Sequence, residues 1–279
     1  MELTTKPRLP ACLDCGAART GPFCHVCGQG PVDPDATVRQ LIGGATRDLF
    51  SWDDRALRTL RVLLTQPGAL AAAWAEGQRM RYVPPLRLFL VLGAVLVGLG
   101  SVHRWIALEA VGVERPASEE ASHRGPSSRS AAYWVGRGIG GAGLNTVLLL
   151  APLVGFAYWA LFRGRRPRLA PHLVHALHIG CVVVLSLLAW RMATLAWLVT
   201  VPARTLGDTL NPTARGLGPA DALGLSWMTS VVAYSAVSVR RFYGVARWRA
   251  VLAAPLVVGV PLAVVVGAAL VVYVVLLAL

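Results

Sequence analysis

Charged residues are scarce in this chain, and lysine is almost missing. Asp, Glu, Lys and Arg together make up 15% of the 279 residues, against about 25% in soluble domains, and Lys6 is the single lysine. Hydrophobic residues reach 55%, and the mean hydropathy is +0.57. This composition argues against an ordinary soluble domain and predicts a protein that lies in a lipid bilayer.

The long apolar runs contain no Asp or Glu, which argues against a transporter that works through intramembrane carboxylates. The GxSxG, HExxH and phosphate-binding-loop patterns are also missing, so the sequence indicates no nucleophile–base pair, zinc protease site or nucleotide site. A membrane enzyme that acts on lipid through a histidine-bound metal would need a carboxylate as well, and no apolar run supplies one. We therefore expect no enzymatic activity.

Cysteine is rare too, but four of its five occurrences stand in two CxxC pairs, Cys12–Cys15 and Cys24–Cys27. Zinc takes four thiolates in a tetrahedron, and each CxxC turn, followed here by a glycine, aims two of them at one ion. Because four cysteines leave no ligand position open, the pattern predicts a structural Zn2+ in a small ribbon. A redox dithiol pair and two disulfides are the alternatives. The fifth cysteine, Cys181, lies in an apolar run and is expected to be a buried hydrophobic residue.

Five apolar segments are candidates for membrane-spanning helices, which need about 20 mainly apolar residues. The third contains His175, His178 and Arg191, and the fourth is short and rich in serine. Such polar residues often lie at helix–helix contacts in membranes, although a surface-lying helix is the alternative for the fourth segment. The expected spans cover residues 86–105, 144–162, 173–201, 222–239 and 250–279.

Arginine in the connections predicts how these spans are oriented. The connections 163–168 and 240–249 each hold four arginines and no acid, whereas 106–143 and 202–221 hold equal numbers of arginines and acids. Because arginine-rich loops stay in the cytoplasm, the N-terminus is predicted inside and the C-terminus outside the inner membrane of a cell. The cysteines then lie in the reducing cytosol, which favours metal over disulfides. The net charge of +13 follows from topology, so nucleic acid is not an expected partner.

Residues 32–85 are expected to form amphipathic helices between the zinc ribbon and the first span. Arginine-flanked amphipathic helices before a span often lie on the anionic inner leaflet. A small cytosolic bundle packed against the loops is the alternative. The expected elements are a helix capped by Asp35, a helix after Asp54 with the apolar stripe Leu57, Leu60 and Leu64 that ends at Pro67-Gly68, and a short helix over Ala69–Gln78.

Three histidines recur every third residue where the third apolar segment begins: His172, His175 and His178. Histidine at membrane depth is a candidate functional residue, and these three are a candidate second site for a metal, a haem or a proton relay. On one helix they spread over about 120°, so at most two of them can share one ion closely. The alternative is that their polar tips lie in the headgroup zone. Arg191 is expected to extend outward at the other end of the span.

Four stretches of the chain carry a family resemblance: CLDCG and FCHVCGQ within Cys12–Gln29, RTLRVLLTQPG at Arg58–Gly68, EGQRMRYVPPLRLFLV at Glu76–Val91 and HLVHALH at His172–His178. They resemble an uncharacterised family of bacterial integral membrane proteins, the domain of unknown function 3667, whose members pair a zinc-ribbon head with an R-Y-V-P-P-R-L start of the first span. The resemblance extends over nearly the whole chain except the outer loops and is most specific at Gly77–Phe89. It implies architecture and membrane location and brings no catalytic residues.

Together these features predict a mainly α-helical, multi-pass bundle of about five spans. Its expected parts are a cytosolic zinc ribbon (1–31), juxtamembrane helices (32–85) and a transmembrane domain (86–279). The leading functional hypothesis is a membrane-anchored scaffold or adaptor whose zinc ribbon docks a protein partner, because closed four-thiolate sites serve structure and contacts. The alternative is a small transporter or channel component with a polar path near His175, His178 and Arg191. An odd number of spans suits assembly into a homo-oligomer.

Overall fold

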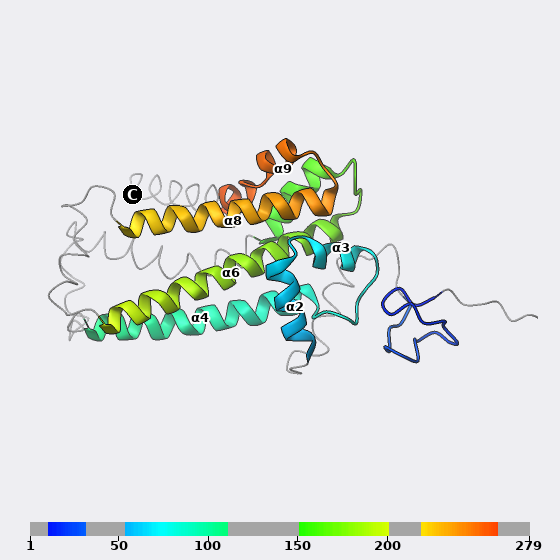
Figure 1. The fold of residues 1–279 in the computed structure, drawn as a ribbon, viewed down its shortest axis with the longest axis horizontal. Coiled ribbons are helices and arrows are strands. Elements are labelled where there is room, and N and C mark those ends of the chain that lie inside the picture. The colour runs from blue at the N-terminus through cyan, green and yellow to red at the C-terminus, as the bar shows by residue number, and fades with distance from the viewer. Residues whose placement is uncertain (1–10, 32–53, 111–150, 201–218, 262–279) are drawn as a thin grey trace, which may run out of the picture.

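The computed structural model describes residues 11–31, 54–110, 151–200 and 219–261. These residues are mainly helical, and no β-strand occurs among them. Two helices carry no label in Figure 1: one over Ala151–Phe162 and a short one over 256–261. The labelled helices are α2 (Asp54–Thr65), α3 (Ala69–Ala75), α4 (Pro85–Ala110), α6 (Leu169–Thr200), α8 (Pro219–Tyr243) and α9 (Arg247–Ala253).

Three long helices form the frame of the molecule. Helices α4, α6 and α8 run side by side along its long axis, with α6 between the other two, and α2 crosses this direction near one end (Figure 1). Helix α6 contacts α2, α3, α4 and α8. Its residues 172–182 are all buried, as expected for a helix that is apolar on every side. Helix α6 is therefore the centre of the fold.

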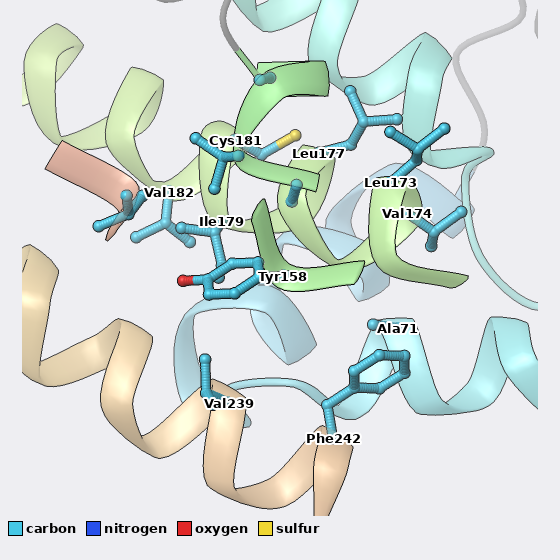
Figure 2. Close-up of a cluster of buried hydrophobic side chains, with 14 of the residues drawn as sticks. Ala71, Tyr158, Leu173, Val174, Leu177, Ile179, Cys181, Val182, Val239 and Phe242 are labelled. Carbon is cyan, nitrogen blue, oxygen red and sulfur yellow. The ribbon is translucent and has the colours of Figure 1, made fainter. Parts of the chain in front are cut away.

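One buried apolar cluster joins α3, the Ala151–Phe162 helix, α6 and α8 (Figure 2). Two glycines let the helices around it approach closely. A Cβ atom at Gly155 would lie 2.7 Å from Cδ2 of Leu173, and one at Gly180 would lie 2.8 Å from Cε2 of Phe89. Small residues at helix contacts are the usual means of close packing in membranes, where lipid is as apolar as a side chain.

Two helices of the described residues are long and apolar enough to cross a membrane, over Pro85–Val102 in α4 and over Leu169–Trp190 in α6. They correspond to the first and third expected spans. The prediction of about five spans is not met in the described part of the chain. The other three expected spans are not among these two helices.

The second expected span, 144–162, is described only from Ala151 onward, where the residues form an apolar helix over Ala151–Phe162. The fourth, 222–239, lies within the continuous helix α8, whose last turn contains the basic pair Arg240 and Arg241, and α8 is not among the two candidate spans of the described residues. The fifth, 250–279, does not start as one helix. Helix α9 ends at Ala253, and a turn at residues 254–255 contains a proline, which lacks the amide that continues a helix. Residues 262–279 lie outside the described part.

The helices before α4 begin and end largely as predicted. Helix α2 ends before Pro67-Gly68, and α3 follows directly, although it stops at Ala75 instead of Gln78. The predicted apolar stripe of α2 is wrong, because Leu57 and Leu64 are 77% and 56% exposed while Leu63 and Thr59 are buried. The helix expected after Asp35 lies outside the described residues.

The arginine-rich connections and the cysteine-containing segment lie at one end of the molecule (Figure 1). This end holds the start of α4, the connection 163–168, and the last turn of α8 with α9 after it. Nη1 of Arg165 donates hydrogen bonds to the carbonyl oxygens of Tyr243 and Gly244, at 3.3 and 2.9 Å, so the first arginine-rich connection is attached to the second. The two arginine-rich connections therefore lie on the same side of the described helices, and the side of a membrane that they would face stays a prediction.

Candidate metal centre

The cysteine-containing segment folds into two turns of the same geometry. In the first turn, the amide of Cys12 donates to the carbonyl of Ala17, and the amide of Gly16 donates to the carbonyl of Cys12, both at 2.9 Å. The second turn, which starts at Cys24, repeats both bonds with the same spacing, at 2.9 and 2.8 Å. The glycines of the two turns have φ angles of 76° and 73°, a region that glycine enters without steric cost. The repeated CxxCG sequence thus produces a repeated turn.

Four sulfur atoms converge between these turns. The Sγ atoms of Cys12 and Cys27 lie 3.5 Å apart, as do those of Cys15 and Cys24, and all four lie within 4.8 Å of one another. A disulfide needs an S–S distance of about 2.0 Å, and all four side chains are free thiols. A tetrahedral site with Zn–S bonds of about 2.3 Å places its sulfurs about 3.8 Å apart, which fits this spacing. The four cysteines can therefore hold a metal ion. The neighbouring His25 is exposed and outside this group.

Backbone amides prepare one thiol of each turn for metal binding. Hydrogen bonds from the amides of Cys27 and Val26 lower the pKa of the Cys24 thiol to about 6. The amide of Cys15 is the main cause of the lowered pKa of Cys12. Burial instead raises the pKa of Cys27 to about 12. Metals bind the thiolate form, so each turn supplies one cysteine that readily becomes an anion.

Two side chains that sequence reasoning did not single out fix this segment to the helices. The Nε2 atom of Gln29 donates to the carbonyl of Gly77 at 2.9 Å, and its Oε1 atom accepts from the amide of Arg79 at 3.2 Å. The Oδ1 atom of Asp14 accepts from the amides of Met80 and Arg81, at 3.3 and 3.2 Å. Both residues belong to the cysteine turns, and both use the loop between α3 and α4 as their partner.

That loop is itself held by buried contacts. The guanidinium of Arg79 lies 3.8 Å from the centre of the Trp74 ring, and burial lowers its pKa. The hydroxyl of Thr59 on α2 donates to the carbonyl of Arg55 at 2.6 Å and accepts from the amide of Val83 at 3.0 Å. The metal-binding head (residues 11–31) is thus joined through residues 77–83 to the point where α4 begins.

The histidines of α6 meet polar groups from other elements. Nε2 of His172 donates to the carbonyl of Arg166 at 2.8 Å; because a neutral imidazole has one N–H, its Nδ1 accepts from the Tyr243 hydroxyl at 2.8 Å. Nε2 of His175 and Oγ of Ser238 on α8 lie 2.9 Å apart. In this arrangement His172 has no lone pair left for a metal, so a second metal site stays a prediction that rests on His175 and His178.

Three buried polar atoms next to this network have no hydrogen-bond partner among the described residues: Nδ1 of His175, Nδ1 of His178 and the hydroxyl of Tyr158. Buried polar groups are nearly always paired, so such atoms mark a region of unusual polarity inside the helices. The side chain of Arg191 lies outside the described part of α6. Cys181 is fully buried, as predicted.

Comparison with known proteins adds little to this geometry. Neither the curated proteins nor the solved structures contain a match to the chain. A family match covers a smaller part of the chain than the motifs indicated: it leaves out the cysteines and the histidines and includes the most specific stretch, Gly77–Phe89. A family described as Protein of unknown function (DUF3667) matches residues 53–97, so the chain is similar to that family over α2, α3 and the first half of α4.

Proposed function

We propose that this chain is a membrane-anchored adaptor whose head holds Zn2+ and docks a protein partner at the cytosolic face of the inner membrane. The observation that carries this proposal is the surface of the head. Leu13, Phe23 and Val26 are 56%, 65% and 64% exposed. Three large apolar side chains are thus exposed on a head of about 20 residues, and exposed apolar surface of this kind is available for a protein contact.

The attachment of the head supports the same reading. Gln29 and Asp14 hold the head against the loop between α3 and α4, so the three apolar side chains are presented by a fixed body. A fixed body loses less entropy on binding than a flexible tail does. Because the four thiols fill every position of a tetrahedral metal, the ion stabilises this surface and offers no open position for substrate, so we expect no enzymatic activity.

Membrane anchoring draws on the helices. Several apolar side chains on the outer surface of α4 are exposed, among them Leu90, Val95 and Val102, as suits a helix that faces lipid. The arginine-rich connections lie at the end that carries the head, and arginine-rich loops stay cytoplasmic. Both observations favour a multi-pass protein with its head in the cytosol.

Photo-crosslinking in cells tests the docking function. A photoreactive residue at the position of Phe23 in the full chain is expected to give a discrete protein adduct. The double variant Leu13→Ser/Val26→Ser is expected to lose that adduct and keep its zinc, because neither residue is a ligand. The matched control His25→Ala, exposed in the same turn, is expected to keep both. Two results would contradict the proposal: an adduct that persists in the double variant, or no adduct from the chain in which the photoreactive residue at position 23 is the single change.

A small transporter or channel component is the second candidate, and the buried polar atoms of His175, His178 and Tyr158 favour it. They lie where α6 packs against α8 and the Ala151–Phe162 helix, through contacts such as His175 with Ser238. Reconstituted vesicles that carry the full chain would be assayed for proton leak. An equal leak from the unchanged protein and from His175→Phe/His178→Phe would remove this candidate.

A further inference from the structure

An open hollow of about 450 Å³ lies at the end of α8, and three arginines line it. We propose that this hollow binds a phosphate-bearing anion, and that the anion is the headgroup of an acidic phospholipid of the inner leaflet. The site shares no residue with the metal-binding head, so it does not depend on the docking function. Its lining residues are Arg165, Arg166, Arg241, Phe242, Tyr243 and Gly244.

Two of the three arginines are anchored to the protein before any ligand binds. Nη1 of Arg165 donates to the carbonyls of Tyr243 and Gly244, at 3.3 and 2.9 Å. Nη2 of Arg166 donates to the carbonyl of Phe242 at 3.4 Å, and its guanidinium carbon lies 4.4 Å from the centre of that ring. A guanidinium carries five N–H donors, so each anchored side chain keeps donors for a ligand. Because these side chains are already ordered, binding of a ligand costs little further side-chain entropy.

The positive charge of the hollow is not neutralised from within. The connections 163–168 and 240–249 contain eight arginines and no acid. No Asp or Glu of the described residues lines the hollow. Several guanidiniums that converge on one open space repel one another, and an anion relieves that repulsion. Their planar forks match the oxygens of a phosphate group, which accept paired hydrogen bonds.

The neighbouring helix favours a lipid as the source of the phosphate. Helix α9 follows the hollow within a few residues, buries Ala250 and Ala253, and exposes Trp248, Val251 and Leu252. A short helix with one apolar outer side that includes a tryptophan suits the interface of a membrane, where tryptophan is enriched. If α9 lies at that depth, the hollow lies at the level of the headgroups.

The test uses the full chain in micelles of a neutral detergent at 0.15 M salt, where charges more than about 8 Å away are largely screened. Native mass spectrometry would measure the dissociation constants of phosphatidate, phosphatidylcholine and inorganic phosphate. The variants are Arg165→Gln/Arg166→Gln/Arg241→Gln and the charge-matched control Arg163→Gln/Arg247→Gln/Arg249→Gln, whose arginines belong to the same connections but do not line the hollow. If loss of the anchored Arg165 and Arg166 unfolds the triple variant, the single variant Arg241→Gln still tests the proposal, because it keeps both anchored arginines.

We expect phosphatidate to bind more tightly than the other two compounds. One arginine near an anionic surface contributes about 1 kcal/mol, which corresponds to about fivefold in affinity. The affinity for phosphatidate is therefore expected to fall about fivefold in Arg241→Gln and about 100-fold in the triple variant. The control is expected to stay within twofold of the unchanged chain. Inorganic phosphate that binds with the same arginine dependence would support the phosphate chemistry and reassign its source to solution. Equal binding of phosphatidylcholine, an unchanged affinity in Arg241→Gln, or an equal loss in the control would overturn the proposal.

Discussion

Replacing Gln29 by alanine is expected to release the metal-binding head from the loop between α3 and α4. Gln29 is 3% exposed, and its amide group bonds to both the carbonyl of Gly77 and the amide of Arg79. A hydrogen bond of this kind contributes about 1–1.5 kcal/mol net, so loss of both weakens docking of the head by about 2–3 kcal/mol. At 1.4 kcal/mol per factor of ten, the population of the undocked head rises about 30- to 150-fold.

Hydrogen exchange of the full chain in detergent measures this population directly. Exchange of peptides that cover residues 77–81 is expected to speed up by the same factor at the amides of Arg79, Met80 and Arg81, because each of them donates to a side chain of the head. The control is His25→Ala, which changes an exposed side chain of the same head. If exchange at 77–81 is the same in Gln29→Ala and His25→Ala, then the two hydrogen bonds do not hold the head, and the reasoning is refuted.

Three further predictions concern the metal, a glycine and a buried hydroxyl. Removing the metal with a chelator, or changing Cys24 to Ser, is expected to unfold the head and to speed up exchange at residues 77–81 as much as Gln29→Ala does; unchanged exchange after complete loss of zinc would contradict this. Gly68→Ala is expected to destabilise the chain by about 2–4 kcal/mol in thermal unfolding, because φ is 81° and the new Cβ would lie 2.8 Å from the carbonyl oxygen of Ser238. The control Gly98→Ala, which has open space around its Cβ, is expected to cause no loss of stability. Thr59→Val is expected to cost about 1–3 kcal/mol, since it leaves the amide of Val83 without a partner; a melting temperature equal to that of Thr65→Val, an exposed control on the same helix, would argue against it.

Local patterns predicted the elements of this chain better than the faces that they bury. The two CxxCG turns and the break at Pro67-Gly68 follow from residues adjacent in sequence, and the structure confirms both. The buried face of α2 did not follow, because the run from Leu60 to Leu64 offers two apolar stripes at helical spacing. Packing against α3 and α6 selects the stripe with Leu63, and Thr59 is buried beside it because its hydroxyl is satisfied on both sides.

The contacts around the site could not be read from spacing either. Asp14 and Gln29 bond to residues 66 and 48 positions away, and no periodicity connects such distant positions. The sequence did contain one hint of these contacts. Asp14 and Gln29 are polar residues inside the cysteine turns that are not metal ligands, so their side chains are available to bond elsewhere. The histidines were predicted as a group from their spacing, but their partners Tyr243 and Ser238 come from α8 and depend on the packing of the helices.

The hydrogen bonds of Gln29 also link two equilibria. The backbone of Gln29 closes the second cysteine turn, through its bond with the amide of Cys24, while its side chain holds the loop before α4. Metal binding and docking therefore share one residue, and if metal binding orders this turn and so favours docking, docking favours metal binding by the same factor. Gln29→Ala is then expected to lower the affinity for zinc without touching a ligand. Occupancy of the four cysteines is then expected to change the order of the loop at residues 77–81, which lies just before α4.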